Sequence, residues 1–109
     1  MKRFNKKEVR CLGGIYGLSF VDMSTDVDLH GEQIGCTNLL GRSIKVAGDM
    51  AASQQRDTLL HEIVHIADYE TADPRSRLRE SDVVRISKAL YSILRDNPGL
   101  AEWIASDDQ

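Results

Sequence analysis

The chain has 109 residues, a length that suits one domain, and we expect a single domain over residues 1–109. Its formal net charge is −3, whereas a general nucleic-acid binder needs clustered Lys and Arg, so we expect no nucleic-acid partner. No apolar run approaches the length that spans a bilayer, and no apolar segment follows the basic start of the chain. We therefore expect a cytoplasmic protein without a membrane partner.

Cysteine usage agrees with that compartment. The two cysteines, Cys11 and Cys36, are too few for a disulfide framework, so we expect both as reduced thiols. Neither has another Cys or a His at a short ligand spacing, which argues against a zinc-finger role for them.

The first half of the chain has the composition of β-structure. Four segments with β-branched and aromatic residues predict short strands: residues 9–12, 15–23, 33–40 and 43–47. Gly13-Gly14 separates the first two, which predicts a strand pair or a bent strand. Gly41-Arg42 separates the last two, which predicts a hairpin. The polar residues 25–32 between the pairs predict a loop.

The second half has helical periodicity. From about Ser53, an apolar face through Leu60, Ile63, Val64 and Ala67 predicts a helix that continues to about Tyr69. Asp73-Pro74 ends it, because the residue before a proline is driven out of the α region.

A second helix is predicted over about residues 77–95. Its inward positions are expected at Val83, Ile86, Leu90 and Ile93 or Leu94. Asn97-Pro98 resembles an N-cap followed by proline at the first helical position, and predicts a short last helix through Leu100, Trp103 and Ile104. Because the strands precede the helices, the predicted fold class is α+β, with a small antiparallel or mixed sheet.

The stretch His61-Glu62-Ile63-Val64-His65 predicts a metal site. Residues four apart share one face of a helix, so His61 and His65 present two imidazoles to one point. Two histidine ligands of one zinc ion need this arrangement. Glu62 lies one residue on, and its carboxylate reaches beside the metal rather than onto it. There it could take a proton from water whose pKa zinc has lowered to about 7. The pattern predicts Zn²⁺ as cofactor and Glu62 as catalytic residue.

The same two histidines could instead be a surface pair or a hydrogen-bonded core pair without a metal, because the five-residue pattern alone has false positives. Two observations favour the metal. The pattern lies in a helix that is predicted independently, and it contains two of the three histidines in the chain.

A catalytic zinc usually has three protein ligands and one open position, so a third ligand is needed. Glu80 is the stronger candidate, since it opens the second predicted helix on a face that turns toward the core. A carboxylate there is costly unless it is paired or bound to metal. The alternative is that Glu80 belongs to a charged first turn with Arg77 and Arg79.

Other side chains are open as candidates. Asp68 shares the face of His61 and His65, where it could be a ligand or could hydrogen-bond a ligand imidazole. The remaining carboxylates near enough in sequence are Glu70, Asp73 and Asp82. His30 lies in the polar loop, where such a residue is more often exposed.

The stretch Thr58-Leu59-Leu60-His61-Glu62-Ile63-Val64-His65-Ile66-Ala67-Asp68 resembles the motif helix of small phage and prophage proteins related to the ImmA/IrrE-type zinc metallo-endopeptidases. Residues 83–90 and 94–98 are similar to the C-terminal half of the same proteins, and the sheet half matches loosely. The resemblance implies a minimal zincin-like domain with metallopeptidase activity.

In that family the third ligand is a glutamate in a Glu-x-x-Ala-like pattern at the start of the next helix. Glu80-Ser81-Asp82-Val83 matches it, with valine in place of alanine. The resemblance thus implies His61, His65 and Glu80 as ligands and Glu62 as catalytic base. The chain departs from larger relatives, whose DNA-binding or sensor regions and Leu-Met-Pro ending have no counterpart here.

Two functions of different classes remain open. The first is hydrolysis of a protein or peptide substrate, in which the predicted strand 43–47 offers its edge to the substrate. Tyr69, Tyr91 and His30 are candidates for stabilising the oxyanion. The second is a zinc-stabilised accessory or binding protein of a mobile element. Small size favours it, whereas the presence of Glu62 argues against it, because a structural site needs no base.

Overall fold

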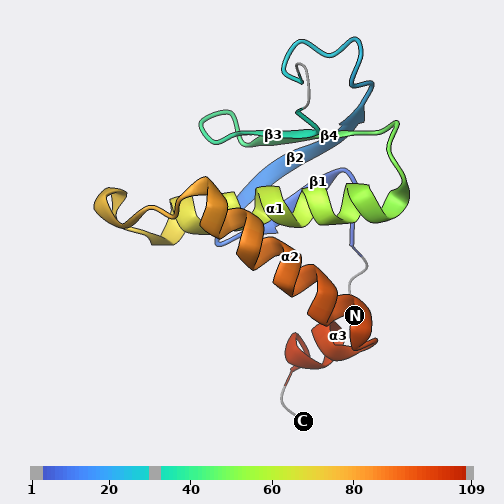
Figure 1. The fold of residues 1–109 in the computed structure, drawn as a ribbon. Helices are drawn as coiled ribbons and strands as arrows, with labels where there is room; N and C mark the ends of the chain where they lie inside the picture. Colours follow the sequence, from blue (N-terminus) through green and yellow to red (C-terminus); the bar gives the residue numbers. More distant parts are fainter. Residues whose placement is uncertain (1–3, 30–32, 108–109) are drawn as a thin grey trace.

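Four β-strands are followed by three α-helices in the computed structural model, which describes residues 4–29 and 33–107 (Figure 1). The strands are β1 (Glu8–Cys11), β2 (Gly14–Val21), β3 (Gly35–Asn38) and β4 (Ser43–Ala47). The helices are α1 (Ala52–Thr71), α2 (Glu80–Asp96) and α3 (Leu100–Ile104), with a 3₁₀ turn, η1 (Pro74–Ser76), between the first two. The predicted α+β class is confirmed.

The strands form one mixed sheet in the order β1-β2-β4-β3. β1 pairs with β2 and β3 pairs with β4 in antiparallel fashion, whereas β2 and β4 run parallel. The β1–β2 turn has positive φ angles at Leu12 and Gly13, 49° and 90°, which suit the twist of a two-residue hairpin. Both predicted strand pairs are confirmed.

β4 lies inside the sheet, so the expectation that residues 43–47 offer a free edge to a substrate is wrong. β4 pairs with β2 on one side and with β3 on the other. The reason is topological, because parallel strands need a crossover connection, and the crossover here contributes β3 as the outer strand. The edge strand on this side of the sheet is therefore β3.

The described part of the predicted polar loop runs up to Leu29, which is buried. Lys45 on β4 holds this loop through its ammonium group, which lies 3.0 Å from an Asp26 carboxylate oxygen and 2.7 Å from one of Asp28. His30 and the rest of the predicted loop lie outside the described residues.

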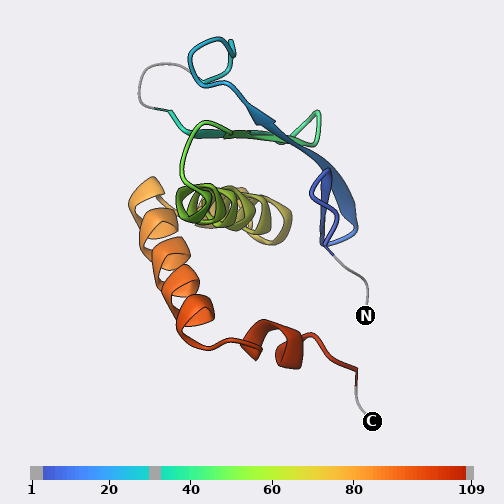
Figure 2. The ribbon, with the colours of Figure 1, turned by 90° about the vertical axis from the view of Figure 1, so that its right-hand side faces the viewer.

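α1 covers one face of the sheet (Figures 1 and 2). The core between them consists of Val9, Tyr16, Leu18, Ile44, Val46 and Ile66. The buried residues of α1 include the polar Thr58 and Glu62, whereas Leu60 and Ala67 on the predicted apolar face are only half-buried. The helix is thus rotated so that Glu62 lies against the sheet. In the described ranges 4–29 and 33–107, every helix is too short or too polar to cross a bilayer.

α2 crosses α1 and then diverges from it and from the sheet (Figure 2). In its first half Val83 is fully buried, as expected. The expectation that Leu90 and Ile93 or Leu94 point inward is wrong, because all three are exposed. The two helices diverge toward this end (Figure 2) and leave a groove between them, lined in part by Leu94, so the apolar stripe of α2 is not covered there.

The end of α2 corrects a second expectation. Asn97 is not the N-cap of the last helix, because its side-chain amide donates to the Ile93 carbonyl at 2.8 Å and so closes the C-terminus of α2. Gly99, with φ at 87°, then turns the chain, and α3 begins at Leu100. Asparagine suits both ends of a helix, since it can accept at an N-cap and donate to the last free carbonyls.

Candidate metal centre

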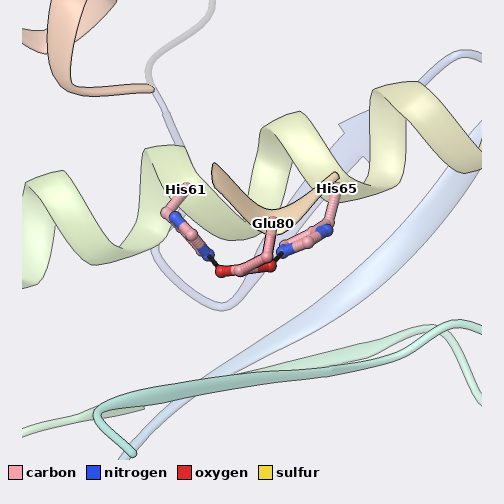
Figure 3. Close-up of side chains that lie close together, drawn as sticks. All are labelled: His61, His65 and Glu80. Atoms are coloured by element: carbon pink, nitrogen blue, oxygen red, sulfur yellow. Dashed lines mark ion pairs between the residues drawn. The ribbon is translucent and has the colours of Figure 1, made fainter. Parts of the chain in front are cut away.

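α1 brings two imidazoles together on one face. His61 and His65 lie one helical turn apart, and their ring centroids are 4.8 Å apart in an edge-to-face arrangement. Both side chains are half-buried and point toward the start of α2 (Figure 3).

Glu80 is the first residue of α2, and its carboxylate reaches both rings (Figure 3). Oε1 lies 2.8 Å from Nε2 of His61, and Oε2 lies 2.8 Å from Nε2 of His65. The first turn of a helix favours a carboxylate, because the N-terminal end of the helix dipole is positive. Asp82 fixes this start by accepting a hydrogen bond from the Arg79 backbone N–H at 3.4 Å.

These three side chains could hold a metal ion. One ligand atom from each lies within 4.8 Å of the others, and ligand atoms around a tetrahedral zinc lie roughly 3.3 Å apart for bonds of about 2.0 Å. Each Nε2 presents a lone pair to a cation when the ring carries its proton on Nδ1. Two imidazole nitrogens and one carboxylate oxygen suit zinc and leave a fourth position open. The side chain of Glu80 is 64% exposed, so solvent reaches this point.

Glu62 lies beside this group, between α1 and β3. The residue is only 6% exposed, and its Oε1 accepts a hydrogen bond of 2.7 Å from the Thr37 hydroxyl. Gly35 lets the strand come this close, because a Cβ there would lie 2.6 Å from Thr58 Cγ2 and 3.2 Å from Glu62 Oε2. Sequence reasoning missed Thr37 and Gly35, since neither residue type in a short strand signals a partner on a distant helix.

An open pocket of about 910 Å³ joins these groups. Residues from β3 and the segment before it, including Ile34, Gly35 and Thr37, form one wall. His61, His65 and Glu80 lie on the helical side. The edge strand of the sheet thus runs along the pocket that contains the candidate ligands.

Asp68 lines the pocket, but the hydrogen bonds that its carboxylate makes go to the chain between the helices. Its two oxygens accept from the Leu78 backbone N–H at 3.3 and 3.2 Å. Arg77, expected in a charged turn with Glu80, donates to the Asp68 carbonyl at 3.1 Å and lies over the Tyr69 ring. Asp68 therefore stabilises the connection that leads to Glu80, and its carboxylate does not hydrogen-bond an imidazole of His61 or His65 in the described structure.

The other carboxylates considered as ligands have different partners. Glu70 accepts a hydrogen bond of 2.8 Å from the buried Tyr16 hydroxyl, and burial together with this bond raises the pKa of Tyr16 to about 12. Asp73 caps η1 through the Arg75 backbone N–H, and Asp82 caps α2 as described above.

Both cysteines are free thiols, as expected. Cys36 is on β3 at the pocket, and its pKa is raised, chiefly by burial and then by the negative charges of Asp28 and Glu62. Burial also raises the pKa of Cys11, with a smaller effect of Glu70. Both side chains therefore stay protonated at neutral pH, a form that neither attacks as a nucleophile nor binds metal well.

Of the three oxyanion candidates, Tyr69 lines the pocket. Tyr91 lines a different groove, between the later part of α2 and the opposite face of α1, so the structure does not place this candidate at the pocket. His30 lies outside the described residues.

Comparison of the chain with protein-family models, with curated proteins and with solved structures finds no match.

Proposed function

We propose that this chain is a zinc-dependent metallopeptidase that hydrolyses peptide bonds in a protein or peptide substrate. The observation that carries the proposal is the convergence of His61, His65 and Glu80 at one pocket with the Glu62 carboxylate beside them. Three such ligands and a neighbouring carboxylate are the donor set and base that metal-assisted hydrolysis requires. A zinc ion held here would polarise a substrate carbonyl and lower the pKa of a water molecule to about 7.

Glu62 transfers the proton from water to the leaving amine in this mechanism. Thr37 engages Oε1 of its carboxylate, so Oε2 is the oxygen that accepts a proton from the attacking water. The same carboxylate then passes the proton to the leaving amine, acting first as base and then as acid. The bond from Thr37 keeps the carboxylate in one orientation throughout.

β3 binds the substrate. As the edge strand beside the pocket, it can take an extended peptide as a further strand through its backbone N–H and C=O groups. Backbone pairing is largely independent of side chains, so the scissile bond is placed by register along β3 rather than by one specificity pocket.

The cytoplasm suits this activity, because both cysteines are free thiols and reducing compartments keep them so. The net charge of −3 supports a protein substrate rather than nucleic acid, and we assign no role to a membrane. The resemblance of residues 58–68 to phage and prophage proteins supports an origin in a mobile element.

The test compares Glu62→Gln with the wild type, each loaded with zinc, on a peptide library read by mass spectrometry. The variant should keep its fold and one equivalent of zinc but lose roughly 100-fold or more in cleavage rate, the usual contribution of a positioned base. Glu8→Gln makes the same chemical change at an exposed position of β1 and should cleave normally. His65→Ala should lose the zinc. Cleavage by Glu62→Gln at the wild-type rate would show that the mechanism is wrong.

A second candidate is a zinc-stabilised binding or accessory protein. The burial of Glu62 and its bond to Thr37 favour it, because a purely structural carboxylate would be held in the same way. This function predicts one equivalent of zinc, no cleavage of any library peptide, and a lower free energy of unfolding for Glu62→Gln.

A further inference from the structure

An apolar groove lies on the far side of α1 from the candidate metal ligands. It has a volume of about 450 Å³, and its apolar walls are Leu59, Leu60 and Ile63 of α1 and Leu94 of α2. These α1 residues stand about half a turn around the helix from His61 and His65. Two cations, Arg56 and Arg95, also line the groove. Arg95 lies 3.7 Å from Asp96 in an exposed pair that contributes little, so an occupant that combines an apolar contact surface with negative charge fits these walls.

α3 has this combination. Trp103 is 76% and Ile104 is 66% exposed, and Glu102 and Asp107 flank them with negative charge. Gly99 turns the chain after α2, and both views place α3 beyond the end of α2 rather than against α1 (Figures 1 and 2). Among the described residues, those that line the groove come from α1 and α2 alone.

The molecule also exposes more surface than its mass requires. Its solvent-accessible surface is 8037 Å², whereas a compact monomer of 12.2 kDa exposes roughly 6,100 Å². The radius of gyration is 14.4 Å, against roughly 13 Å for a compact chain of this length. The excess surface is larger than the roughly 800 Å² that each partner buries in a standard protein interface.

We propose that α3 of a second copy of this chain occupies the groove, and that the exchange is reciprocal. A two-fold axis would bring each α3 onto the groove of the partner, so that one dimer contains two identical contacts. Trp103 would be the buried anchor of each contact, and Glu102 and Asp107 would face the two arginines. The dimer leaves the pocket with the metal ligands open, because the groove lies on the other face of α1.

The test is the mass of the full-length protein in sedimentation equilibrium across micromolar concentrations. The wild type should have twice the mass of the 12.2 kDa chain. Trp103→Asp should weaken dimerisation by roughly 30-fold or more, the effect of losing a buried aromatic anchor. Arg56→Glu/Arg95→Glu should weaken it as well, and addition of Glu102→Arg and Asp107→Lys to that chain should restore the dimer.

Mixing the Trp103→Asp variant with the Arg56→Glu/Arg95→Glu variant tests whether the exchange is reciprocal. Trp103→Asp has an intact groove and Arg56→Glu/Arg95→Glu has an intact α3, so the mixture should form a heterodimer with one working contact. Leu40→Asp is the matched control, because Leu40 is 92% exposed in the β3–β4 turn and should not affect the dimer.

Three results would overturn the proposal. One is a wild type that is monomeric at every concentration. Another is a dimer whose dissociation constant is unchanged by Trp103→Asp and by Arg56→Glu/Arg95→Glu. The third is a monomer whose free energy of unfolding falls with Trp103→Asp, because α3 would then cover the groove of its own chain. Far-ultraviolet circular dichroism of each variant should match that of the wild type, which separates loss of the contact from loss of the fold.

Discussion

The hydrogen bond between Thr37 and Glu62 joins residues 25 positions apart, and the orientation of the proposed base depends on it. The candidate site was only partly predictable at this scale. His61, Glu62 and His65 were predictable, because their relation needs only the local geometry of one helix. Thr37 was not, because which helix residue a strand residue faces depends on the order of strands in the sheet.

Thr37→Val should slow peptide cleavage without releasing zinc. The substitution keeps the shape of the side chain but removes the donor to a buried carboxylate, a loss of about 1.5–3 kcal/mol for a bond to a charged group. If the whole loss is expressed in the transition state, it corresponds to a fall in kcat of roughly 10-fold to 150-fold. Thr37→Ser retains the hydroxyl and should cleave nearly as well as the wild type. An unchanged kcat in Thr37→Val would show that the hydrogen bond from Thr37 is not needed to orient Glu62.

At the scale of elements, the strands and helices follow from periodicity, but their pairing does not. Local turn residues predict a strand pair or a bent strand around Gly13-Gly14 and a hairpin at Gly41-Arg42, and both antiparallel pairs form. The parallel alignment of β2 with β4 is a long-range choice that no local pattern encodes, and it decides that β3 rather than β4 is the edge. The ends of α2 show the same limit, because Asn97 caps the helix before it instead of the one after it.

Gly35→Ala should push β3 away from α1. Its Cβ would lie 2.6 Å from Thr58 Cγ2, so strand or helix must shift, at a cost of about 1–3 kcal/mol for overpacking. Gly17→Ala is the matched control, since a Cβ on this β2 glycine would meet nothing within 4 Å. Urea titration measures both, and Gly35→Ala/Thr58→Ser should regain part of the loss. Equal free energies of unfolding for the two single variants would contradict the close approach of β3 to α1.

For the whole molecule, the change of period near Ser53 was enough to predict a sheet followed by helices. The exposure of Leu90, Ile93 and Leu94 was not predictable, because periodicity tells which face of a helix is apolar but not how far its partner extends. The proposed third ligand is a similar case. Glu80 follows a connection of eight residues after α1, and only the folded connection, held by Asp68, determines where its carboxylate arrives.

Zinc removal should destabilise the whole fold, because His61 and His65 lie on α1 and Glu80 lies on α2. A ligand present at 100 times its Kd adds about 2.7 kcal/mol to the free energy of unfolding. For a domain of about 100 residues this shifts Tm by roughly 10–20 °C. Thermal scans with added zinc and with a chelator measure the shift, and His65→Ala should give the same low Tm in both. If the wild type unfolds at one temperature under both conditions, the ion does not link the helices.

The outer position of β3 has a consequence for motion. β2 is bonded on both sides, so its backbone amides can exchange with solvent only when much of the sheet opens. β3 has four residues and one neighbouring strand, so it can separate while β1, β2 and β4 stay paired. The wall that faces the proposed ligands is thus an edge strand, as β1 is on the other side of the sheet, and it can open while the central pair β2 and β4 stays bonded. A peptide bound along it would give β3 a second neighbour and slow its exchange.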